Sequence, residues 1–182
     1  AYRVLISLEI SHLLNGNEKI ITDSVLSALE TSPYLSKIES LSLESNHQVT
    51  VQGFKHIADS RFCFNICEIN CSNSNINDEG LKELANSKFL LNLHRIELKG
   101  CSKITAQGLK YIITSNCLSF RFSIDDLFAN LAEIHQKNIL SDELLECLST
   151  SPRLKHLHSL RLFYSKDEIT SNAFKKLLSN NN

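Results

Sequence analysis

Tryptophan and methionine are absent from this chain of 182 residues. The missing initiating methionine, with Ala1 leading almost directly into a predicted strand, is what we expect of a fragment or of a processed chain. No run approaches the roughly 20 apolar residues that cross a bilayer, and no signal-peptide pattern is present. The formal net charge of −1 provides no attraction to polyanions. We therefore expect neither a membrane nor a nucleic acid as partner.

Glycine and proline are also scarce, with five and two residues. The glycines occur singly, which excludes a glycine-rich loop that binds phosphate. Pro33 and Pro152 lie in the similar segments LETSPYLSKIESLSL and LSTSPRLKHLHSLRL. Each is expected to end a helix, because proline lacks the N–H group and crowds the preceding turn. Their matching positions indicate an internal repeat.

The repeat has a period of about 28 residues. Each copy has an apolar L-x-x-L-x-L strand followed by I-T-x-x-G-L-x-x-L, and the clearest copy begins at His94. We call the second leucine-type residue of the strand motif the anchor. The six anchors are Leu8, Leu41, Ile69, Ile96, Ile124 and Leu160. A period in this range is typical of arrays whose units stack because none can bury its apolar face alone.

The second half of each copy has apolar residues at helical spacing, directly after a polar residue that can cap a helix. The side-chain oxygen of such a cap accepts a hydrogen bond from a free N–H group in the first helical turn. The expected caps are Thr22, Thr50, Asn77, Thr105, Ser141 and Thr170. Gly53, Gly80 and Gly108 lie at the start of three of these helices, where a missing side chain allows close packing between units. The sequence therefore predicts alternating strands and helices in an α/β fold.

The string L-x-L-x-x-C-x-x-I-T-x-x-G-L-x-x-L, which contains Cys101, resembles the cysteine-containing class of leucine-rich repeats, which is related in architecture to ribonuclease inhibitor. Similar arrays occur in F-box adaptors and in some effectors of intracellular bacteria. The resemblance implies an α/β leucine-rich repeat solenoid, a curved horseshoe segment of about six repeats with a parallel sheet on the concave side and helices on the convex side. It also implies a ladder position for cysteine or asparagine, which Asn46 and Cys101 match and the other copies match poorly. We expect no F-box segment before the repeats, so the resemblance alone does not carry the adaptor role over to this chain.

We expect one leucine-rich repeat domain over residues 1–182, complete or as a fragment of a longer protein. The fifth copy departs from the pattern at Arg121 and Asp126, and it carries an insertion at about 125–138. Apolar residues at helical spacing in the insertion predict an extra short helix, capped by Asp125 or Asp126. Such a helix either covers the core or projects toward a partner, because insertions in a regular array often mark the binding face.

The six cysteines include Cys63, Cys67 and Cys71, whose spacing of four would align metal ligands on a helix. The repeat instead places them in the return from helix to strand, at the strand entry and at an inward strand position, where an extended chain keeps them apart. We favour buried thiols over a metal site. Free thiols are typical of a reducing compartment. This predicts the cytoplasm, or a host cytosol for a secreted bacterial effector.

The histidines are the remaining candidates for chemistry. His56 with the nearby cysteines could form a nucleophilic pair, but no residue orients it and no oxyanion donor is indicated. His156 and His158 flank Leu157 and supply too few ligands for a metal, so solvated side chains are the simpler interpretation. We therefore expect no enzyme activity, no cofactor and no metal.

A surface for a partner is expected on the sheet, because side chains alternate along a strand and those beside the buried anchors face the open side. The rows directly before, directly after and three residues after the anchors are polar with an acidic lean. Arginine and aromatic residues, which are common in interfaces, follow near the C-terminus. The candidate partner-binding residues, including those of the insertion, are Glu44, Glu68, Asn70, Arg95, Glu97, Lys99, Asp125, Leu127, Phe128, Arg161, Phe163 and Tyr164. A solvated sheet face would have a similar composition.

These features favour a non-catalytic protein–protein interaction module, an effector or adaptor, that binds a protein through the concave sheet face and the insertion. The alternative is a regulatory or targeting region of a larger enzyme, such as a ubiquitin-ligase component, whose catalytic part lies outside this chain. Neither terminal copy resembles a polar cap, so one end of the array is expected to be covered by self-association or by a missing segment.

Overall fold

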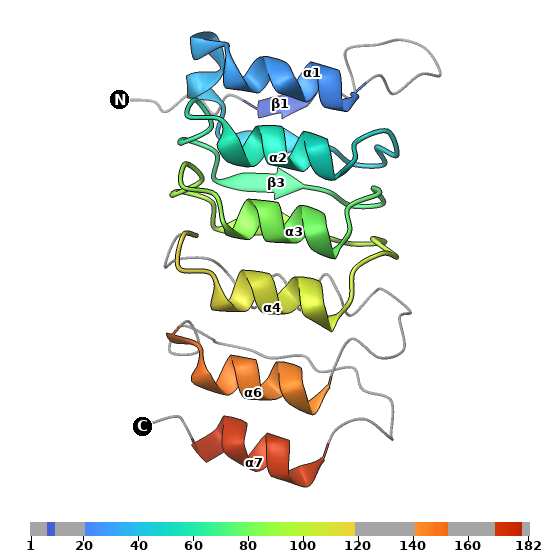
Figure 1. Cartoon of the computed structure of the whole chain (residues 1–182), viewed down its shortest axis with the longest axis vertical. Coiled ribbons are helices and arrows are strands. Elements are labelled where there is room, and N and C mark those ends of the chain that lie inside the picture. The colour runs from blue at the N-terminus through green and yellow to red at the C-terminus, as the bar shows by residue number, and fades with distance from the viewer. Residues whose placement is uncertain (1–6, 10–20, 119–140, 153–169, 180–182) are drawn as a thin grey trace.

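The computed structural model describes residues 7–9, 21–118, 141–152 and 170–179. Within these ranges the chain has a mixed α/β fold with six α-helices and a small parallel sheet. In Figure 1 the helices lie one below another in chain order, from α1 near the N-terminal end to α7 near the C-terminal end. None of the described helices is long and apolar enough to cross a membrane.

The sheet consists of short parallel strands that are adjacent in chain order. The strands are β1 (Ser7–Glu9), β2 (Ser40–Ser42), β3 (Glu68–Asn70) and β4 (Arg95–Glu97). The pairing places Leu8 opposite Leu41, Leu41 opposite Ile69, and Ile69 opposite Ile96. The predicted strands and the equivalence of their anchors are therefore confirmed for these four copies.

A row of helices accompanies the sheet. The α-helices are α1 (Asp23–Ser27), α2 (Val51–Asp59), α3 (Asp78–Ala85), α4 (Ala106–Thr114), α6 (Asp142–Thr150) and α7 (Ser171–Ser179). Two 3₁₀-helices, η2 (Ala28–Glu30) and η3 (Pro33–Lys37), lie between α1 and β2. The anchors Ile124 and Leu160 and the insertion at about 125–138 lie outside the described residues.

Polar side chains cap most of these helices. Side-chain oxygens accept a first-turn N–H group, over 3.0–3.3 Å, at Thr50, Asn77, Thr105, Ser141 and Thr170. Thr22 has the N-cap position of α1, but its hydroxyl shares a hydrogen bond of 2.7 Å with the hydroxyl of Ser24. The predicted caps are therefore confirmed at five positions, and the predicted side-chain cap is wrong at Thr22, where a neighbouring hydroxyl competes for the oxygen.

The core lies between the sheet and the helix row. Leu41, Ile69 and Ile96 are each at most 1% exposed and join helical side chains such as Phe54 in one cluster. Full burial of one such side chain stabilises the fold by about 1.5–3 kcal/mol. Gly80 lets neighbouring helices approach, because a Cβ atom there would lie 2.9 Å from Cδ2 of Phe54. The predicted role of the helix-start glycines in close packing is thus confirmed.

A residue in the left-handed backbone region follows three of the strands. Ser45, Asn73 and Gly100 have φ angles of 54°, 55° and 72°, and each lies four residues after an anchor. This region is costly for most residues other than glycine and asparagine. The N–H of Ser45 donates to the C=O of Ser72 over 2.7 Å, and the N–H of Asn73 donates to the C=O of Lys99 over 2.6 Å. The turns therefore extend the backbone ladder beyond the strands.

One buried polar side chain lies beside each of these turns. The amide of Asn46 donates to the C=O of Ile21 over 3.0 Å, and its Oδ1 accepts two N–H groups of the next turn over 2.9 and 3.1 Å. Cys101 occupies the same repeat position and donates its S–H to the C=O of Cys71 over 2.9 Å. Ser74, which the sequence comparison did not match to this position, is buried there too. A buried asparagine, serine or cysteine thus occupies this position in all three consecutive copies.

Serine hydroxyls join successive helix ends. Ser60, Ser87 and Ser115 each follow a helix. The hydroxyl of each donates, over 2.5 Å, to a C=O group in the helical element of the unit before its own. Ser151 does the same toward α4 over 3.2 Å. The last carbonyl groups of a helix have no partner within the helix. The serines of one unit therefore provide hydrogen-bond donors for C-terminal carbonyl groups of the helix in the unit before it.

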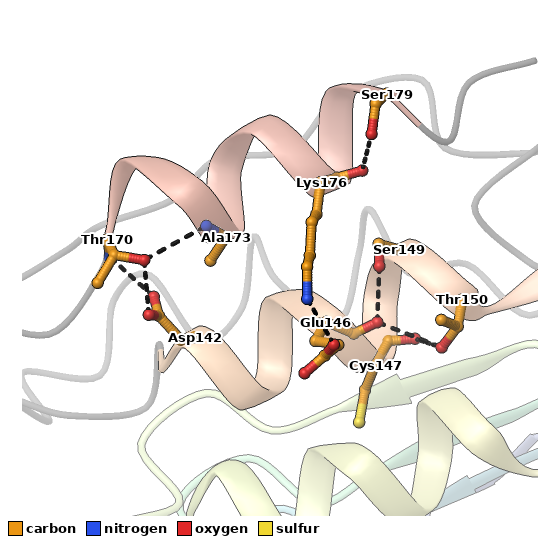
Figure 2. Close-up of polar contacts among 9 residues, drawn as sticks. All are labelled: Asp142, Glu146, Cys147, Ser149, Thr150, Thr170, Ala173, Lys176 and Ser179. Atoms are coloured by element: carbon orange, nitrogen blue, oxygen red, sulfur yellow. Dashed lines mark hydrogen bonds and ion pairs between the residues drawn. The ribbon is translucent and has the colours of Figure 1, made fainter.

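Aspartates make the matching connection at the N-terminal ends. Asp23, Asp78 and Asp142 begin α1, α3 and α6, and each accepts the backbone N–H and the hydroxyl of the threonine that caps the next helix. Figure 2 shows Asp142 against Thr170, where both bonds measure 2.7 Å. These bonds, the backbone bond foremost, lower the pKa of Asp142. Gly108 leaves room for the arrangement, because a Cβ atom there would lie 2.3 Å from Oδ1 of Asp78.

We expect Asn46→Ala to lower the free energy of unfolding by about 2–4 kcal/mol, since it leaves one C=O group and two N–H groups without a partner at a buried position. Urea unfolding measures the change. Ser74→Ala, at the same repeat position, removes a longer hydrogen bond of 3.4 Å to the N–H of Ile76. It is the matched control and should cost about 1 kcal/mol. A loss for Asn46→Ala no larger than that of the control would contradict the prediction.

Stability should also depend on the ionisation of Asp142. Its folded pKa lies below the unfolded value, so its bonds stabilise the fold above the unfolded pKa, and this contribution is lost as the pH falls toward the folded pKa. Between about pH 5 and about pH 3, the wild type should therefore lose more unfolding free energy than Asp142→Asn. The exposed Asp59→Asn variant should follow the wild-type curve. Parallel urea-unfolding curves for the wild type and Asp142→Asn would disprove this role.

Candidate functional site

Strand residues beside the anchors form two polar rows on the sheet face turned away from the helices. The row directly before the anchors contains Ser40, Glu68 and Arg95, and the row directly after them contains Ser42, Asn70 and Glu97. All six are half-buried, whereas the anchors between them are buried. This is the alternation that an extended strand imposes. The structure therefore brings the predicted residues Glu68, Asn70, Arg95 and Glu97 together.

Arg95 lies between two glutamates of the last two described strands. Its Nη1 lies 3.3 Å from Oε1 of Glu68 on β3, and its Nη2 lies 2.8 Å from Oε1 of Glu97 on β4. The three side chains are 40%, 32% and 23% exposed, so the charges are partly shielded from water and attract more strongly than fully solvated ones. This ion-pair cluster was not predicted from the sequence. Opposite charges at equivalent positions of adjacent copies were the available signal, because such residues face each other across a sheet.

The residues three after the anchors form the rim of the face, and only some of them are exposed as predicted. The amide of Asn70 donates to Oε2 of Glu44 over 3.4 Å, and both Glu44 and Lys99 are exposed. Ser72, three residues after its anchor, is 5% exposed. The prediction that this row faces the open side is therefore wrong at Ser72. Glu44 and Lys99 occupy the same repeat position and are exposed, so the burial is specific to the short side chain of Ser72.

The described part of the face has a small acidic excess. On β2 to β4 and the turns that follow them, its three carboxylates belong to Glu44, Glu68 and Glu97, and its two cations belong to Arg95 and Lys99. The acidic lean is smaller than expected because Arg95 pairs with two of the three carboxylates. The other candidate residues lie outside the described residues: Asp125, Leu127, Phe128, Arg161, Phe163 and Tyr164.

The thiols occupy separate structural positions. Cys63, Cys71 and Cys101 are at most 2% exposed, and burial raises the pKa of each thiol. The half-buried thiols are Cys67, Cys117 and Cys147. In the ranges that the structure covers, no three or more histidine, cysteine or acidic side chains are grouped so that they could hold a metal ion. The cysteines near the third strand are therefore core residues or half-buried ones.

His56 has a structural contact. Its Nδ1 lies 2.5 Å from Oε1 of Glu30, and its Nε2 lies 3.4 Å from the amide nitrogen of Gln52. Both ring nitrogens thus take part in polar contacts, and the carboxylate of Glu30 orients the imidazole. The contact joins η2 to α2, so it connects neighbouring units of the helix row.

The positions of the thiols predict their reactivity. In the native protein at about pH 8, iodoacetamide should modify the half-buried thiols at least about tenfold faster than the buried ones, because the thiolate must form and be reached. The buried group is Cys63, Cys71 and Cys101. Mass spectrometry of the digested protein identifies the labelled sites, and labelling in urea, where all six should react, is the control. Rapid native labelling of Cys71 or Cys101 would show that this part of the core is open.

The chain matches no protein-family model, and no curated protein sequence matches it significantly. Its function is therefore inferred from the residues described above.

Proposed function

We propose that the chain is a leucine-rich repeat solenoid of the cysteine-containing, ribonuclease-inhibitor-like class. Three observations support this assignment. The anchors are aligned in a parallel sheet, the helices stack in chain order, and Asn46 and Cys101 make buried hydrogen bonds at the ladder position. Stacked units of this kind form an extended concave surface. The sheet face would line that concave side.

The function that the site supports best is the non-catalytic binding of a protein partner through the sheet face. The observation that carries this proposal is the ion-pair cluster of Arg95 with Glu68 and Glu97 on the sheet face. Arginine is enriched among the residues that dominate interface energies. Complementary charges also select partners and reject those of the wrong sign.

The cluster is suited to recognition because it is ordered before a partner arrives. The planar guanidinium of Arg95 can accept an aromatic ring on its face while its edge stays paired. The neighbouring Ser40 and Ser42 are small, so they leave room beside the cluster for side chains of a partner. Exposed Glu44 and Lys99 add polar contacts at the rim. The insertion at about 125–138 completes the proposed surface, and the free thiols favour a reducing compartment, the cytoplasm or a host cytosol.

Arg95→Ala should weaken binding of the partner at least about tenfold. The partner is isolated by affinity capture on the immobilised chain, identified by mass spectrometry and purified, and calorimetry then gives the Kd of the pair. Ion pairs at a protein surface contribute about 0–1 kcal/mol to stability, and this cluster is only partly shielded from water, so the variant should unfold close to the wild-type urea concentration. The matched control is Lys55→Ala on the exposed side of α2, which should bind like the wild type.

Two results would contradict the proposal. Equal Kd values for the wild type and Arg95→Ala would exclude the cluster from the interface. Weaker binding by Lys55→Ala, with normal binding by Arg95→Ala, would place the interface on the helices.

A further inference from the structure

Three segments that return the chain from a helix to the next strand lie side by side at one edge of the molecule. They comprise residues 31–39, 60–67 and 86–94, and we call them together the return-loop edge. Because the strands are parallel, the segments that enter them meet at the same edge of the sheet. The side-chain amide of Asn65 donates to the C=O of Ser36, and that of Asn92 donates to the C=O of Phe64, each over 2.7 Å. These bonds hold the three segments in contact.

The return-loop edge exposes large apolar side chains. Tyr34 is 89% exposed, Leu91 58%, Phe64 44% and Phe89 37%. They are four of the seven exposed large hydrophobic residues in the described part of the chain. Phe64 and Leu91 lie five residues before their anchors, and Tyr34, Phe62 and Phe89 lie seven before theirs, so they form two adjacent rows. A concentration of exposed apolar groups of this kind marks an interaction site.

The exposed charges of the same edge are positive. Lys37, Arg61 and Lys88 are exposed, and the one acidic residue of the three segments, Glu39, is half-buried. None of the three cations forms an ion pair within the described residues. The guanidinium of Arg61 lies 4.9 Å from the ring centroid of Phe62, so charge and aromatic surface are adjacent. Since the whole chain has a formal net charge of −1, this positive charge is a local property of the edge.

In contrast to the expectation from the net charge of the whole chain, we propose that the return-loop edge docks on the surface of a membrane that contains anionic lipids. Exposed aromatic and aliphatic side chains enter the headgroup region, while lysine and arginine contact the anionic groups. A fluid bilayer needs no complementary pocket, so it accepts side chains that protrude separately from three segments. The docking is peripheral and reversible, because each basic residue near an anionic surface raises the affinity about fivefold.

Two other kinds of partner fit these residues less well. Protein contacts to nucleic acid commonly use about 6–10 basic groups, whereas the edge provides three and combines them with the aliphatic Leu91. A protein partner would have to desolvate Lys37, Arg61 and Lys88 and pair each with a carboxylate. At a bilayer surface the same cationic groups stay hydrated while their stems and the neighbouring apolar side chains are buried.

Co-sedimentation with lipid vesicles tests the proposal. The chain should bind vesicles of about one part phosphatidylserine to two parts phosphatidylcholine, and it should bind phosphatidylcholine alone at least about tenfold more weakly. High salt should weaken the binding to the mixed vesicles. Lys88→Glu and Phe64→Ser should each reduce binding about tenfold, the first through charge and the second through lost apolar contact.

The matched controls lie away from the return-loop edge. Lys103→Glu makes the same charge change in a loop that leads from a strand to a helix, and Val25→Ser removes a side chain that is 41% exposed on α1. Both should bind the mixed vesicles like the wild type. Arg95→Ala should also retain vesicle binding, which separates this docking from the proposed binding of a protein by the sheet face. Thermal unfolding of each variant verifies that it is folded. If Phe64→Ser proves unstable, the vesicle binding of Lys88→Glu still decides the test.

Several outcomes would overturn the docking. The first is that the chain does not bind the mixed vesicles. The second is an equal loss of vesicle binding in Lys88→Glu and Lys103→Glu, which would indicate a general effect of charge rather than a contact at the edge. The third is that single-stranded RNA binds, and depends on Lys88, while vesicles do not.

Discussion

The parallel register of the short strands is the constraint on which the rest of this structure depends. A strand of three residues can neither bury its anchor nor pair its backbone without its neighbours. With Leu41, Ile69 and Ile96 opposite one another, each unit completes the core of the next. A slip of one residue would turn Glu68 or Arg95 toward the core, where an uncompensated charge is far more costly than a lost contact.

Hydrogen bonds between units hold that register from both ends of the helices. Apolar burial stabilises the stack but tolerates small displacements, because many hydrophobic arrangements of similar volume are close in energy. A hydrogen bond loses its strength within a few tenths of an ångström. Asp78 receives two bonds from Thr105 at one end, and Ser87 donates to the C=O of Ala58 at the other. Burial therefore supplies most of the stability, and these bonds fix how the units align.

The sequence was sufficient for features that depend on the pattern of a single unit. Anchors and helix starts are of this kind, which explains why the four described strands and five of six caps were predicted correctly. Features that join two units were missed, because the partner of Asp78 or Ser87 lies nearly thirty residues away and in part on the backbone. The missing cap bond of Thr22 and the burial of Ser72 were mispredicted, because both depend on local geometry that the repeat pattern does not encode. The cluster around Arg95 could have been predicted from charges at equivalent positions, whereas the bonding of the helix ends could not.

Equivalent positions in successive units form rows, so one alignment of the backbone creates several surfaces at once. The sheet face and the return-loop edge contain different residues of the same units, and neither includes the anchors that stabilise the fold. Side chains of the face project perpendicular to the sheet, whereas the return segments lie beyond the ends of the strands. These two directions are roughly at right angles. A membrane in contact with the edge would therefore leave Arg95 and its glutamates open to a protein, and the two proposed contacts can be made by one molecule at the same time.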